Sequence, residues 1–129
     1  GTLGHSDGDP VLHAVSDALL GACKMGDIGQ MFSNKNNKYK NIRSTLLLKK
    51  IIKLIKSKKY FINNLDINII IQAPKIQKYK IKMIDSISKL CKISKDQINI
   101  KGKTTEKLGV IGKEKAVACE VILSMNKND

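Results

Sequence analysis

Arginine and aromatic side chains are scarce in this sequence. Arg43 is the only arginine although the formal net charge is +13, tryptophan is absent, and aromatic residues make up 4% of the chain. Proteins that bind nucleic acid use arginine for bidentate contacts and aromatic rings for stacking on bases. We therefore predict no nucleic-acid partner and interpret the lysines as a solvated coat that helps attract a polyanionic substrate. Charge alone leaves a basic nucleic-acid-binding module open as an alternative.

The sequence also lacks long apolar runs and any paired cysteine pattern. No run is long enough to span a bilayer, and the first residues are neither basic nor apolar enough for a signal peptide, so no membrane partner is expected. The three cysteines, Cys23, Cys91 and Cys119, are odd in number and have no C-x-x-C spacing. They are predicted to be reduced core residues in a reducing compartment.

The 129 residues, 42% of them hydrophobic, predict a single domain over residues 1–129. The spacing of apolar residues predicts helices from Asp9 to about Lys24, from Ser44 to about Lys58, and from Tyr79 to Cys91. Strands are predicted at Leu65–Gln72, Ile98–Lys101 and Ala116–Met125, the last of them buried on both faces. So small a sheet leaves open edges and faces, which predicts further N-terminal strands or a partner subunit.

Candidate chemistry is concentrated between His5 and Phe32. Asp9 and Pro10 indicate a helix start, with Asp9 as the cap. His13 and Asp17 are four residues apart and share one face of that helix, where a carboxylate can orient a metal-binding imidazole. The loop HSDGD leads into the helix N-terminus, which favours anions. These residues alone are compatible with a solvated pair or with a metal-assisted phosphate site.

The sequence contains five blocks in a fixed order: HSDGD, LHAVSDALLGA, GDIGQMF, IIIQAPK and KTTEKLG. Together they resemble the 2-C-methyl-D-erythritol 2,4-cyclodiphosphate synthase family of the non-mevalonate isoprenoid pathway, from Gly1 to about Met125. The resemblance implies an α/β (α+β) domain with a small mixed sheet and helices on one face. It also implies a homotrimer whose sheets pack around the central axis and whose active sites lie at subunit interfaces. The expected location is a plastid (apicoplast or chloroplast stroma) or otherwise the bacterial cytoplasm.

The resemblance implies a lyase that uses two metal ions. The 2-phosphate of 4-diphosphocytidyl-2-C-methyl-D-erythritol 2-phosphate would attack the β-phosphorus, giving the 2,4-cyclodiphosphate and CMP. His5 and Thr104 are the implied catalytic residues, His13 a zinc ligand, and Glu106 a ligand of a second divalent ion, Mg²⁺ or Mn²⁺. The family's Asp-x-His pair, which supplies two more zinc ligands, has no counterpart here. We therefore expect that the chain lacks its N-terminal strand segment, and a catalytically impaired trimeric homologue is the alternative.

The resemblance further implies a pocket for a CDP-linked substrate. The implied substrate-binding residues are His5, Ser6, Asp27, Ile28, Gly29, Phe32, Ser33, Asn34, Lys35, Asn36, Ile71, Gln72, Ala73, Pro74, Lys75, Ile76, Gln77, Lys103, Thr104, Thr105, Glu106, Val110 and Lys113. Asp9 and Asp17 are expected to orient the contacting groups without touching substrate. The sequence departs from the family pattern at Asn34, Lys103 and Lys113, where aspartate, threonine and arginine are usual.

Overall fold

The computed structural model describes residues 8–32, 43–72, 76–104 and 115–128. Within these ranges four α-helices, three strands and one short 3-10 helix are present. In chain order they are α1 (Asp9–Ala22), α2 (Ile28–Met31), α3 (Ser44–Ser57), β1 (Tyr60–Gln72), α4 (Ile76–Cys91), the 3-10 helix η2 (Lys95–Gln97), β2 (Ile98–Thr104) and β3 (Lys115–Lys127). All three long predicted helices and all three predicted strands are confirmed.

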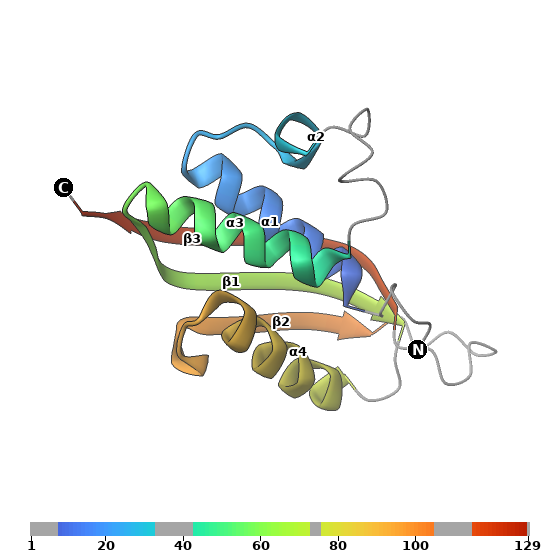
Figure 1. The fold of residues 1–129 in the computed structure, drawn as a ribbon. Coiled ribbons are helices and arrows are strands. Elements are labelled where there is room, and N and C mark those ends of the chain that lie inside the picture. The colour runs from blue at the N-terminus through green and yellow to red at the C-terminus, as the bar shows by residue number, and fades with distance from the viewer. Residues whose placement is uncertain (1–7, 33–42, 73–75, 105–114, 129) are drawn as a thin grey trace.

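The strands form a mixed sheet in the order β2-β1-β3, as Figure 1 shows. Strand β1 runs parallel to β2 and antiparallel to β3. In the register Ile67 of β1 lies between Ile100 of β2 and Val121 of β3, which places an apolar row across the sheet. The predicted small mixed sheet is therefore confirmed.

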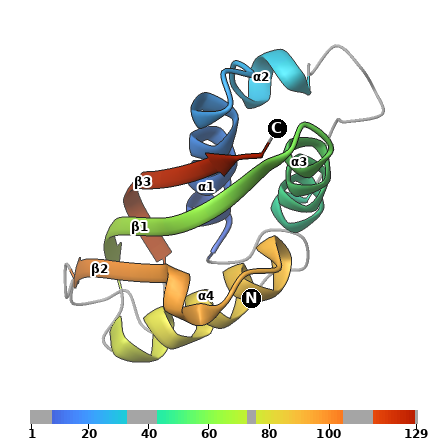
Figure 2. The ribbon, with the colours of Figure 1, turned by 90° about the vertical axis from the view of Figure 1, so that its left-hand side faces the viewer.

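The three long helices cover one face of this sheet (Figure 2). Alternate residues of β1 on that face are buried, including Leu65, Ile67 and Ile69, and form one core with α1, α3 and α4. On the opposite face Ile70 and Ile122 are 44% and 60% exposed. The prediction that β3 is buried on both faces is wrong for this chain by itself, because its residues alternate between the helical core and the uncovered face.

The helix starts differ from the predicted caps. Gly8, not Asp9, is the N-cap of α1, so Asp9 is the first helical residue. Arg43 is the N-cap of α3, so Ser44 lies inside that helix, where its Oγ is buried without a hydrogen-bond partner among the described residues. The predicted cap of α1 is displaced by one residue, because the capping preference of aspartate does not by itself determine where helical dihedrals begin.

The helix ends are occupied by lysines in the left-handed conformation. Lys24, Lys59 and Lys92 follow α1, α3 and α4 with φ values of 55°, 66° and 57°. Glycine is the usual residue at this position because it has no Cβ. Gly26 also has a positive φ, but it lies four residues beyond the end of α1 at Ala22.

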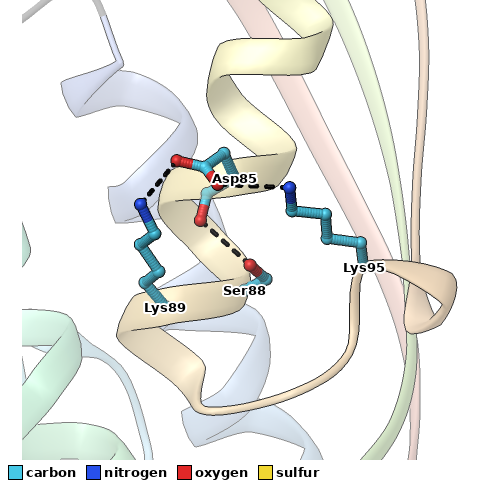
Figure 3. Close-up of polar contacts among 4 residues, drawn as sticks. All are labelled: Asp85, Ser88, Lys89 and Lys95. Atoms are coloured by element: carbon cyan, nitrogen blue, oxygen red, sulfur yellow. Dashed lines mark hydrogen bonds and ion pairs between the residues drawn. The ribbon is translucent and has the colours of Figure 1, made fainter.

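A cluster of polar contacts joins α4 to the 3-10 helix η2 (Figure 3). The carboxylate of Asp85 lies 3.0 Å from Lys89 Nζ and 3.3 Å from Lys95 Nζ, and its carbonyl accepts from Ser88 Oγ. Hydrogen bonds from Lys89 and then Lys95 lower the pKa of Asp85. The ion pair with Lys95 links η2 to α4, whereas the contacts with Lys89 and Ser88 lie within α4.

No helix in the described ranges is long and apolar enough to cross a membrane.

Two glycines allow a matched test of packing. A Cβ on Gly102 in β2 would lie 2.7 Å from Ile69 Cγ1 and 3.0 Å from Ile76 Cδ1, whereas a Cβ on Gly21 in α1 would meet nothing within 4 Å. We expect Gly102→Ala to lower the free energy of unfolding by about 1–3 kcal/mol through overpacking. Gly21→Ala should raise it by about 0.4–1 kcal/mol, because alanine reduces the freedom of the unfolded chain. Urea unfolding followed by circular dichroism measures both, and equal effects would contradict the packing at Gly102.

Candidate active site

The carboxyl ends of β1 and β2 meet at one end of the sheet. In the register Ile71 lies beside Thr104, and Gln72 lies beside Lys115 at the start of β3. Helix α1 begins near the same end (Figure 1). Because parallel strands end at the same edge, Ile71 and Thr104, 33 positions apart in the sequence, become neighbours. The structure thus brings together four of the implied substrate-binding residues, Ile71, Gln72, Lys103 and Thr104.

A second group of predicted site residues lies around the short helix α2. Asp27 is its N-cap, and the Asp27 Oδ1 atom accepts from the Gln30 N–H at 2.8 Å. Ile28 and Gly29 are the first two helical residues, and Phe32 is the C-cap. The sequence analysis predicted no helix here, because four residues are too few to show helical periodicity.

Asp17 connects this short helix to α1. Its Oδ1 atom accepts a hydrogen bond of 2.9 Å from the backbone N–H of Ile28. Asp17 was expected to orient His13, but among the described contacts no hydrogen bond joins the two side chains. His13 is exposed on α1, so its imidazole is accessible to a metal ion.

The described residues contain no group of three histidine, cysteine, aspartate or glutamate side chains placed to hold a metal ion. His13 therefore fits zinc as one ligand of a set that the described residues do not complete. Of the other predicted residues, Asp9 lies in the first turn of α1, and Ile76 and Gln77 begin α4. Outside the described residues lie His5, Ser6, Ser33, Asn34, Lys35, Asn36, Ala73, Pro74, Lys75, Thr105, Glu106, Val110 and Lys113.

A cleft of about 620 Å³ lies on the uncovered face of the sheet. Its polar lining includes Asn68, Lys101, Lys103 and Glu120, of which only Lys103 was predicted as a site residue. Next to the cleft, the Asp66 carboxylate accepts hydrogen bonds from Asn99 at 3.1 Å and from Lys101 at 3.0 Å. The bond from Asn99 has the larger effect, and both bonds lower the pKa of Asp66. Polar and apolar residues alternate in β1, which is typical of a strand with one more polar face, but this pattern does not show which residues β2 and β3 supply beside it.

The three cysteines are unsuited to nucleophilic catalysis. Burial raises the pKa of Cys91 to about 12 and that of Cys119 to about 11, and it also raises the pKa of Cys23. The thiolate is the reactive form of cysteine, so burial disfavours the reactive form of each of the three side chains.

Comparison with known proteins identifies the family. The sequence model of the YgbB family matches residues 1–126. The chain belongs to the YgbB family. Among YgbB relatives, the 2-C-methyl-D-erythritol 2,4-cyclodiphosphate synthase of Fusobacterium nucleatum is 46% identical over 129 residues, with 98% of this chain and 81% of that protein covered.

Two further YgbB relatives extend the comparison. The bifunctional enzyme IspD/IspF of Pelagibacter ubique is 74% identical over the whole chain, which spans about a third (35%) of that longer protein. The solved structure of IspF from Plasmodium falciparum in complex with CDP is 42% identical, with a TM-score of 0.73, and the alignment covers 98% of this chain and 76% of that one. The resemblance suggested by the five sequence blocks is thus confirmed at the level of the family and the fold.

Proposed function

We propose that this chain converts 4-diphosphocytidyl-2-C-methyl-D-erythritol 2-phosphate into 2-C-methyl-D-erythritol 2,4-cyclodiphosphate and CMP. The observation that carries the proposal is the YgbB family match over residues 1–126 together with 46% identity to a named synthase. The CDP complex of the Plasmodium relative supports a CDP-linked substrate. In this reaction an oxygen of the 2-phosphate forms the new bond to the β-phosphorus while the bond to CMP breaks. No protein nucleophile is needed, which agrees with the raised pKa of the three buried thiols.

The residues of this chain would bind the substrate in two parts. In the proposed trimer, Ile71 and Gln72 at the end of β1 would line the cytidine pocket of the neighbouring subunit, and the adjacent Thr104 would contact the diphosphate. Asp27, Ile28 and Gly29 would hold the methylerythritol phosphate. Zinc would be held in part by His13, and Mg²⁺ or Mn²⁺ in part by Glu106. When bound, these ions would neutralise charge on the phosphate oxygens.

A homotrimer with interfacial sites is the proposed assembly. The uncovered face of the sheet supports it, because Ile70 and Ile122 are exposed there beside the cleft, as expected of a face that a further subunit covers. Light scattering should then give three times the chain mass of 14.3 kDa. A monomer at micromolar concentration would contradict the proposal.

For the cellular location, the 74% identity to a bacterial protein supports the bacterial cytoplasm over a plastid.

The decisive experiment is phosphorus NMR of the reaction with that substrate. We expect equal amounts of CMP and cyclodiphosphate in the presence of zinc with Mg²⁺ or Mn²⁺. The chain should be assayed beside a version extended at the N-terminus by a segment that carries the Asp-x-His pair. Activity in the extended version alone would show that the further zinc ligands are required. Absence of CMP from both would contradict the proposed function and favour a catalytically impaired homologue.

A further inference from the structure

Asp17 lies on α1, the helix that carries His13, and its side chain contacts the start of α2. Its side chain is exposed on the middle of α1, yet its Oδ1 atom lies 2.9 Å from the amide nitrogen of Ile28, eleven residues further along the chain. The first N–H groups of a helix have no partner within the helix. Asp17 satisfies one of these groups from a different helix, and so ties the start of α2 to the side of α1.

Other contacts fix the remaining parts of the same turn. The Met25 N–H donates to the Leu20 carbonyl at 2.8 Å, and the Asp27 side chain accepts from Gln30. Gly26 has a φ of 79°, and its missing Cβ leaves room for the side chain of Gln30. The Met25 contact holds the turn to the end of α1, and the Asp27 contact lies within α2. The Asp17 contact holds α2 itself, at the residue on which its first helical turn begins.

We infer that Asp17 is a positioning residue that sets the Asp27–Ile28–Gly29 segment for the methylerythritol phosphate end of the substrate. The inference rests on the proposed function, in which these three residues hold that part of the substrate. It differs from the role expected from helical spacing, in which Asp17 orients the imidazole of His13. A small displacement of a binding segment weakens substrate binding strongly. The Asp17 contact matters for function because it prevents such a displacement.

The inference separates two variants of Asp17. Asp17→Ala removes the acceptor and leaves the Ile28 N–H to solvent. Asp17→Asn keeps a carbonyl oxygen that can accept the same hydrogen bond, although without the charge. Asp96→Ala is the matched control, because Asp96 is an exposed aspartate in η2, away from α1 and α2.

The test combines steady-state kinetics with two readouts that do not depend on activity. In the version of the protein that releases CMP, we expect Asp17→Ala to raise KM about tenfold with a smaller change in kcat, while Asp17→Asn recovers most of the loss. Amide hydrogen exchange of Ile28 should be faster in Asp17→Ala, and bound zinc should be unchanged. Asp96→Ala should match the parent protein in all three measurements.

The outcomes distinguish the possible roles of Asp17. Loss of zinc from Asp17→Ala with unchanged exchange at Ile28 would overturn the inference in favour of a role at His13. An unchanged KM in Asp17→Ala would overturn it as well. If the parent protein releases no CMP, the proposed function fails and the substrate role of Asp17 fails with it. The exchange of Ile28 would then still report whether Asp17 holds α2.

Discussion

Replacing His13 by alanine is expected to reduce CMP release by about 100-fold or more. Metal ions stabilise charge in phosphoryl transfer by several kcal/mol, and each 1.36 kcal/mol corresponds to a factor of ten in rate. His13 is exposed on α1, and alanine is the best helix former, so the fold should be retained. The loss should therefore appear in kcat and in bound zinc but not in the circular dichroism spectrum.

The control for this variant is Lys53→Ala, which changes an exposed residue of α3. It should keep both zinc and activity. Treating the unsubstituted protein with a chelator should reduce CMP release as His13→Ala does. Zinc added back at one concentration should restore CMP release in the chelated unsubstituted protein but not in the variant. Full activity in His13→Ala would show that this imidazole is not a required ligand.

Replacing Ile67 by alanine is expected to lower the free energy of unfolding by about 3–4 kcal/mol. Ile67 is completely buried in β1, the central strand, between Ile100 and Val121 in the register. Truncation of a buried isoleucine loses its transfer free energy and leaves a cavity, at a total cost of about 2–5 kcal/mol. The rigid sheet on both sides limits how far neighbouring residues can relax into the space.

The matched control is Ile81→Ala, which deletes the same atoms from a side chain of α4 that is 68% exposed. Its free energy of unfolding should change by at most about 0.5 kcal/mol. Urea denaturation of both variants at one fixed protein concentration makes the comparison. Similar midpoints for Ile67→Ala and Ile81→Ala would contradict the position of Ile67 in the core.

The long helices and the strands were predictable because their apolar residues repeat at helical or alternating spacing. In α3, Leu47, Leu48, Ile51 and Ile55 recur on one face and are buried. The uncovered face of the sheet was not predictable from β3, because apolar residues on both sides of a strand indicate burial without stating which chain supplies it. Ile122 therefore suggested an interior position, although it is exposed in this chain.

The candidate site was predictable as a set of residues but not as a geometry. The proximity of Ile71 and Thr104 depends on parallel pairing of two strands separated by a helix, which no local pattern encodes. The contact from Asp17 to Ile28 joins residues eleven positions apart through a turn whose shape depends on Gly26. Helical spacing offered Asp17 a nearer partner in His13, and for that reason the sequence indicated a different role.

The left-handed lysines at the helix ends have a consequence for how this sequence can evolve. A residue with a Cβ in that conformation costs about 1–2 kcal/mol relative to glycine, and Lys24, Lys59 and Lys92 each carry this cost. Natural domains are stable by only about 5–15 kcal/mol, so three such positions amount to a substantial fraction of the total. Single changes to glycine at these surface positions would offset destabilising substitutions near the site. Glycine at these helix ends would therefore raise the stability of the domain enough for it to tolerate further destabilising substitutions and still fold.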